Sequence, residues 1–243
     1  MTLAIPPNMA PAHATHAPLS RTKRGVAAPD RLWPQHSVLT ISLLNMTKEQ
    51  KDVIKHNINK WAPHTNLYFK FTDRPNGDIR IVAKNDTDNA WSMIGTAAKK
   101  IPLSEPTMSI GFKRTPTDLA ATIQHEFGHA LGLRHEHQHP DRTLDLNKPN
   151  IHQEYESQGL FAYNADEEVI QTPPRIQVKA SPYDQKSIMH YGFKASDLQS
   201  GPPIPRPTQI SGEDEHFMQS LYPQDKSLLG RLLNTTIRAM VNT

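Results

Sequence analysis

The chain has 243 residues, enough for one substantial domain with tails, and 36% hydrophobic and 21% charged residues are typical of a globular protein. No apolar run approaches the roughly 18 residues of a membrane span. The formal net charge is +3, and the basic residues are scattered along the sequence except for the RTKR segment at 21–24. The absence of cysteine excludes disulfides and thiolate metal sites.

The first half of the chain carries strand patterns around one helix pattern. Residues 1–24 are rich in proline and alanine, which predicts disorder, and no secretory signal is visible in them. Strands are expected at residues 36–44, 66–71, 78–83, 91–98 and 107–112, from β-branched content or alternation of apolar and polar positions. Thr47 and Gln50 form a predicted capping box for an amphipathic helix between the first two strands.

A central helix is predicted at about residues 118–131, capped by Thr115 or Thr117 and ended by Gly132 in a left-handed conformation. The second half is less regular, because prolines between 173 and 207 favour loops. Short helices are expected at about 211–221 and 228–241.

The segment HEFGHALGLRHEH, residues 125–137, holds four histidines and two glutamates. A solvated polar run and buried core histidines are alternative interpretations, but residues four apart share one helix face, so His125 and His129 point to one place. Gly132 lets the chain turn back so that His135 supplies a third nitrogen. The full HExxHxxGxxH pattern therefore predicts a site for one catalytic Zn²⁺, with Glu126 beside it as general base.

The extended motif resembles the metzincin metallopeptidases, and two features narrow the resemblance to the astacin family. Glu136 follows the third histidine, and PYDQKSIMHYG at 182–192 is similar to the astacin Met-turn. RLWP at 31–34, DIRI at 78–81 and HPDR at 139–142 also match. The resemblance covers about residues 25–223, which leaves 1–24 as a possible pro-segment and 224–243 as a C-terminal helical extension.

The resemblance implies an α+β, metzincin-like catalytic domain. Its expected parts are a twisted, mainly antiparallel N-terminal sheet with two long helices, a zinc cleft and an irregular C-terminal subdomain. It also implies that the protein is a zinc metalloendopeptidase.

Further roles are implied residue by residue. Tyr191 resembles the tyrosine whose phenol ligates the resting zinc and later stabilises the oxyanion. Met189 resembles the methionine that forms the apolar floor of the site. Glu136 resembles the glutamate that anchors the amino terminus of the matured protein. By analogy with the upper rim of the cleft, the residues expected to bind substrate are Trp91, Ser92, Met93, Ile94 and Gly95. His190 is expected not to ligate zinc, and His137 and His139 to lie around the site or at the surface.

The chain departs from the family pattern in three respects. Astacins usually carry two disulfides, Gln185 stands where a tyrosine is common, and residues 1–24 contain no acidic residue that could cap the zinc as a propeptide does. Cleavage after Arg24 and an exposed basic linker remain equal interpretations of RTKR.

Protein or peptide substrates are expected, with no nucleic acid or membrane partner, and a monomeric state. The compartment stays undetermined, because the resemblance favours secretion whereas the missing signal and cysteines are compatible with the cytoplasm. Three alternatives remain: a matrixin-like peptidase, a zinc-stabilised binding module without catalysis, and a nucleic-acid binder, which rests only on a pI of about 9.0.

Overall fold

The computed structural model describes residues 25–241, so the prediction of disorder for residues 1–24 lies outside the described residues. The strands are β1 (Val26–Ala27), β2 (Val38–Leu44), β3 (Tyr68–Thr72), β4 (Ile79–Lys84), β5 (Trp91–Ser92), β6 (Met108–Gly111) and β7 (Lys179–Ala180). The helices are α1 (Lys48–Ile58), α2 (Pro116–Ala130), α3 (Lys148–Ser157), α4 (Ala162–Ala165), α5 (Gly212–Leu221) and α6 (Leu228–Val241). None of these helices is long and apolar enough to cross a membrane.

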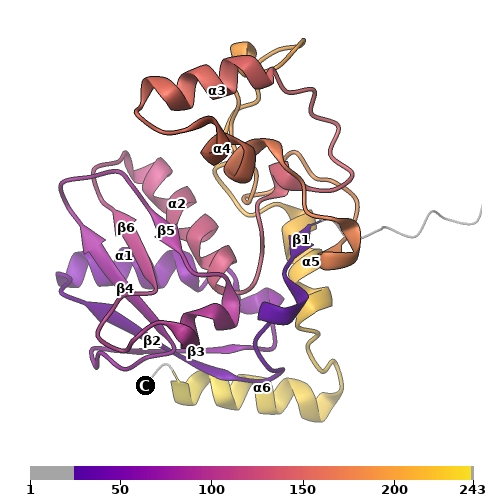
Figure 1. Ribbon diagram of the computed structural model, residues 1–243. Coiled ribbons are helices and arrows are strands. Elements are labelled where there is room, and N and C mark those ends of the chain that lie inside the picture. Colours follow the sequence, from indigo (N-terminus) through magenta and orange to yellow (C-terminus); the bar gives the residue numbers. More distant parts are fainter. Residues whose placement is uncertain (1–24, 242–243) are drawn as a thin grey trace, which may run out of the picture.

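Five strands form one sheet in the order β3-β2-β4-β6-β5, and α1 and α2 pack beside each other against it (Figure 1). The expectation of a mainly antiparallel sheet is wrong: β2 runs parallel to β3 and β4, and β4 runs parallel to β6. Within this sheet only the edge strand β5 is antiparallel to its neighbour, and β1 and β7 form a separate antiparallel pair. The connection through α1 brings the chain back to start β3 at the same end as β2, which makes that pair parallel. Alternation of side chains fixes which face of a strand is buried but not its direction.

The apolar core lies between the sheet and the two helices and contains the apolar residues that the strand patterns place inside, although the intervening Tyr68 and Arg80 are buried as well. Leu39, Ile41 and Ile81 are buried, and the Phe69 ring meets the Phe127 ring edge-on at a centroid distance of 5.1 Å. The indole Nε1–H of Trp61 donates to the Gln124 carbonyl at 3.0 Å, which ties the end of α1 to α2. This core holds α2 rigidly under the sheet.

The structure differs from the sequence-based expectation in one predicted strand and in two helices that were not expected. The strand expected at 91–98 is only Trp91–Ser92, because Gly95 adopts φ +49° and a 3₁₀ helix at Gly95–Lys100 follows. Helices α3 and α4 were not predicted, although Asn147 caps α3 by accepting from the Asn150 amide at 3.3 Å. Figure 1 shows both on the side of α2 away from β2, β3 and β4.

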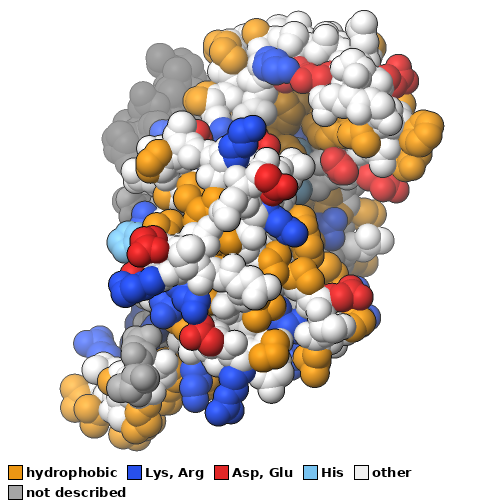
Figure 2. Space-filling view, turned by 90° about the vertical axis from the view of Figure 1, so that its left-hand side faces the viewer, with side chains coloured by type: hydrophobic (Ala, Val, Ile, Leu, Met, Phe, Trp, Pro, Cys, Tyr) orange, Lys and Arg blue, Asp and Glu red, His pale blue; other side chains and the backbone are white. Residues whose placement is uncertain are grey.

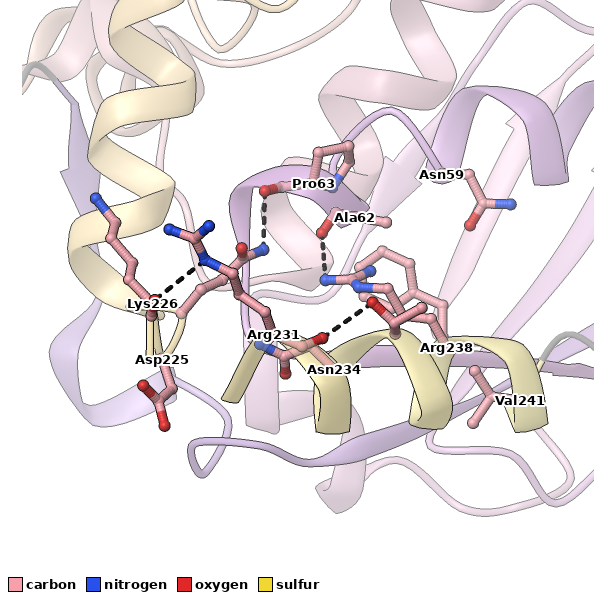
Figure 3. A pocket seen from close by; sticks show the side chains of 12 residues that line it. Asn59, Ala62, Pro63, Asp225, Lys226, Arg231, Asn234, Arg238 and Val241 are labelled. Carbon is pink, nitrogen blue, oxygen red and sulfur yellow. Dashed lines mark hydrogen bonds between the residues drawn. The ribbon is translucent and has the colours of Figure 1, made fainter. Parts of the chain in front are cut away.

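The C-terminal helix α6 packs on β3 through its polar side. The Arg238 guanidinium donates to the Ala62 and Thr65 carbonyls at 2.6 and 2.8 Å, beside a cavity of about 680 Å³ (Figure 3). Leu228, Leu229, Leu232 and Leu233 remain exposed, and Figure 2 shows hydrophobic side chains at the lower end of the molecule, where Figure 1 places α6.

Candidate metal centre and active site

Helix α2 presents the first part of the site. Thr115 caps it by accepting from the Asp118 amide at 3.3 Å, and Pro116 occupies the first turn, where a missing N–H costs nothing. His125, Glu126 and His129 are all buried in its last turns. Gly132 then takes φ +104°, a conformation that favours glycine, and ends the helix as the sequence predicts.

Three imidazoles converge at the end of α2. One ring nitrogen each of His125, His129 and His135 lies within 4.8 Å of the other two, and Nε2 of His129 lies 3.0 Å from Nε2 of His135. Tetrahedral zinc ligands at ~2.0–2.1 Å from the ion lie roughly 3.4 Å from one another, so this group of three nitrogens is compatible with a zinc ion.

Backbone carbonyls select the ring nitrogens that face the centre. The His125 Nδ1–H donates to the Ile188 carbonyl at 2.7 Å, and the His129 Nδ1–H donates to the Leu133 carbonyl at 2.9 Å. These bonds leave both Nε2 atoms unprotonated toward the centre. Burial lowers the pKa of His129 to about 4 and lowers the pKa of His125 and His135 well below the usual value. All three rings are therefore neutral at neutral pH, which is the metal-binding form.

Glu126 follows the first histidine and lies beside the centre rather than among the converging nitrogens. Its side chain is 8% exposed, and this burial raises the pKa of the carboxyl to about 7, while the charges of Arg206 and Arg114 oppose the shift. A carboxyl group with a pKa near neutrality can both accept and return a proton.

The segment 182–192 passes under the three histidines. Met189 is buried against α2 at Gly128, where a β-carbon would lie only 2.4 Å from the Met189 sulfur. The Tyr191 ring lies 4.5 Å from the His135 ring and 6.0 Å from the His125 ring, and burial raises the pKa of its phenol. Both residues are thus next to the centre, and their roles in it stay predictions.

Glu136 is 1% exposed and joins the third histidine to the Met-turn. Its amide donates to the Met189 carbonyl at 3.0 Å, and its Oε1 accepts from the Asp184 amide at 2.8 Å. Its Oε2 has no hydrogen-bond partner among the described residues. Arg24 lies outside those residues, so the anchoring of a matured terminus stays a prediction.

The structure brings further residues to the site that the sequence did not single out. Asp214 of α5 accepts from the Ser187 hydroxyl at 2.6 Å and from the Ile188 amide at 2.8 Å. The capping box formed by Ser211 and Asp214 was the signal in the sequence, but it predicts a helix start and not a contact 26 residues away.

The other histidines near the centre are buried, namely His137, His139 and His190, so a surface position for His137 or His139 is wrong. His137 is 0% exposed and stacks on the Tyr191 ring at 4.1 Å, while His139 bonds the Ser181 carbonyl. His190 does not belong to the converging group and instead bonds the Tyr183 hydroxyl at 2.6 Å.

Four of the five residues predicted to bind substrate, 91–94, lie at or next to the edge of the sheet, whereas Gly95 is buried and begins the 3₁₀ helix. Among the described residues β5 pairs only with β6, and Trp91 is 44% exposed. The Met93 amide donates to the Thr107 carbonyl at 2.9 Å. Because successive amides of an extended segment point in opposite directions, the Ile94 amide is directed away from β6.

Comparisons with known proteins agree with this geometry. The family model for Astacin (Peptidase family M12A) matches residues 25–211. The chain is 28% identical over 183 residues to zinc metalloproteinase nas-14 of Caenorhabditis elegans, an alignment that covers 74% of this chain and 33% of that protein. It is 27% identical over 218 residues to bone morphogenetic protein 1 of Xenopus laevis, covering 82% of this chain and 28% of that protein.

The chain thus spans about a third of the length of these two relatives. Among solved structures, myroilysin superposes with a TM-score of 0.78 at 29% sequence identity, covering 83% of this chain and 100% of that chain.

Proposed function

Because the chain belongs to the astacin family, peptidase family M12A, we propose that it is a zinc-dependent endopeptidase that hydrolyses internal peptide bonds of proteins or peptides. The membership confirms the predicted family and its α+β, metzincin-like fold in a cysteine-free form. It also argues against a matrixin-like peptidase. One observation supports the activity most strongly: three neutral imidazoles converge beside a buried carboxyl group.

In this proposal three histidines, His125, His129 and His135, would hold one zinc ion, and Tyr191 would be a further ligand of the resting enzyme. When bound, zinc would supply Lewis acidity at the scissile carbonyl and would lower the pKa of a bound water to about 7. Glu126 accepts the proton of the attacking water and delivers it to the leaving amine. The pKa of about 7 at Glu126 suits a group that performs both transfers.

Tyr191 stabilises the oxyanion that develops on the carbonyl oxygen, by donating a hydrogen bond from its phenol. Burial keeps this phenol protonated, because it raises the pKa of Tyr191. Contacts of this kind contribute about 3–4 kcal/mol to transition-state stabilisation. Met189 closes the site from below with an apolar side chain.

The substrate binds as an extended strand along the open edge of β5, with its backbone paired to residues 91–94. Unpaired edge strands commonly add a peptide in this way. The solvent-exposed Trp91 and the outward amide of Ile94 support this placement.

The test is Glu126→Gln, measured by zinc content and by mass-spectrometric mapping of cuts in a diverse peptide library. Zinc content should stay at that of the wild type, while kcat/KM should fall about 10²–10⁴-fold. Glu156→Gln on the exposed face of α3 is the matched control and should behave as the wild type.

Near-native cleavage by Glu126→Gln would refute the role of the carboxyl group. Wild-type protein that binds zinc but cleaves no peptide would favour the zinc-stabilised binding module instead. Salt-dependent retention on DNA, together with absent cleavage, would favour the nucleic-acid binder.

A further inference from the structure

A chain of hydrogen bonds runs from α5 to the first zinc-ligand candidate. It ends at His125, whose Nδ1–H donates to the Ile188 carbonyl at 2.7 Å. The amide of the same peptide unit is that of Met189, and it donates to the Ser187 hydroxyl oxygen at 3.0 Å. The Ser187 hydroxyl in turn donates to Asp214 Oδ1 at 2.6 Å.

Every donor in this chain points the same way. The Asp214 carboxylate accepts from the serine hydroxyl, the hydroxyl oxygen accepts from the peptide, and the peptide carbonyl accepts from the imidazole. Hydrogen bonds aligned head to tail polarise one another, and burial strengthens each of them. The Asp214 carboxylate thereby polarises the Ile188 carbonyl to which the His125 ring donates.

Asp214 is held so that it cannot turn out of this arrangement. It is 2% exposed, its Oδ2 accepts from the Ile188 amide at 2.8 Å and from the Ser211 amide at 2.9 Å, and its own amide donates to Ser211 Oγ at 3.0 Å. Such a position is costly for a carboxylate unless its oxygens are bonded, as they are here. A residue needed only to start α5 would not require the two bonds to the Met-turn.

We propose that Asp214, acting through Ser187 and the Ile188–Met189 peptide, is a positioning residue that orients His125 and strengthens its Nε2 as a zinc ligand. The proposal rests on the proposed function, because it assumes that His125 binds zinc. Carboxylates that bond a ligating histidine directly fix its tautomer and raise its basicity. Here a hydroxyl and a peptide unit lie between the two groups. Asp214 also lies beyond residues 25–211, which the family model matches.

The test measures the zinc dissociation constant of the full chain by competition with a chromophoric chelator, without substrate. Asp214→Asn keeps the shape of the side chain. If the asparagine oxygen still accepts from the Ile188 and Ser211 amides, the NH₂ group faces the Ser187 hydroxyl and donates where the carboxylate accepted. The common direction of the hydrogen bonds would then be lost. Zinc binding should weaken about 10–100-fold, the effect found when an outer partner of a ligand is removed. The absorption spectrum of the cobalt-loaded protein should shift as well, because the His125 ring is reoriented.

Asp197→Asn is the matched control. Asp197 is also a buried carboxylate near a turn, where it accepts from the Lys194 amide at 2.7 Å, but it contacts α3 through Asn150 and not the Met-turn. Its variant should bind zinc as the wild type does. Ser187→Ala removes the middle of the chain and tests the same path if Asp214→Asn does not fold.

The double variant should bind zinc no more weakly than the weaker single variant, because both changes interrupt one path. The positioning role is overturned if Asp214→Asn and Ser187→Ala match Asp197→Asn, or if their effects simply add. In those cases wild-type zinc binding leaves the proposed function intact. Wild-type protein that binds no zinc would overturn both.

Discussion

The two parts of the chain on either side of the third histidine are stabilised in different ways. In the N-terminal region, residues 26–133, the strands are joined by ladders of backbone bonds and covered by apolar side chains such as Ile41, Ile79 and Ile81. In the C-terminal region, residues 136–222, Met189 and the apolar side chains of α5 join that same core, and the region's own apolar cluster is smaller. Irregular segments dominate there. There the Arg142 guanidinium binds the His137, Val169 and Ile170 carbonyls at 2.7, 3.0 and 2.5 Å.

The comparison shows which groups form hydrogen bonds with the backbone N–H and C=O groups of an irregular segment. Buried N–H and C=O groups must be paired, and side chains take over this task where no ladder exists. Asp184 and Asp214 do so in the Met-turn, and Arg142 does so for the carbonyls of residues 137, 169 and 170. The part of the site that comes from α2 thus rests on apolar packing, whereas the part beneath it depends on a few buried polar side chains.

The largest effect is expected from Ile81→Ala in the N-terminal core. Ile81 is fully buried, and removal of such a side chain costs about 2–5 kcal/mol in the free energy of unfolding. Ile151→Ala in the smaller cluster should instead open the C-terminal region locally, with β2 and β4 still protected. Native-state hydrogen exchange distinguishes the two, and equal loss of protection in β4 would mean that the regions unfold as one unit.

A smaller effect is expected at the contact between the regions, from Gly128→Ala. Alanine normally stabilises a helix by about 1 kcal/mol relative to glycine. Here the added carbon would lie 2.4 Å from the buried Met189 sulfur, and overpacking costs about 1–3 kcal/mol. A net decrease in the free energy of unfolding in urea should follow. Gly212→Ala in α5 serves as the control, because its added carbon would meet no atom within 4 Å. If both variants are more stable than the wild type, the Met189 side chain moves aside at no cost and the prediction is wrong.

The features of the fold and the site that depend on local sequence patterns could be predicted, whereas those that depend on contacts between distant segments could not. Alternation at residues 66–71 and 78–83 predicts strands because the burial of one sheet face repeats every two residues. The spacing of His125, His129 and His135 predicts the centre because a helix and one glycine turn determine it. Strand direction and the link from Asp214 to the Met-turn depend on contacts between distant segments, which no local pattern records.

The smallest effect on stability, and a selective one on function, is expected from Ile94→Pro. The φ of −83° at Ile94 is close to the value that proline fixes, so the free energy of unfolding should hardly change. The lost amide should raise KM several-fold if substrate pairs with this edge. Ile94→Ala keeps the amide and separates the backbone from the side chain. An unchanged KM in the proline variant would discard the assignment of residues 91–94.

The N-terminal and C-terminal regions meet without any covalent cross-link, because the chain has no cysteine. A thiol introduced by mutagenesis would therefore be unique, and a fluorophore or spin label would attach at a single chosen position. A pair of labels, for example at the exposed Leu103 and Tyr163, would report the distance between the two regions in solution. Reducing agents could be present throughout such an experiment, since the native architecture contains no bond that they would break.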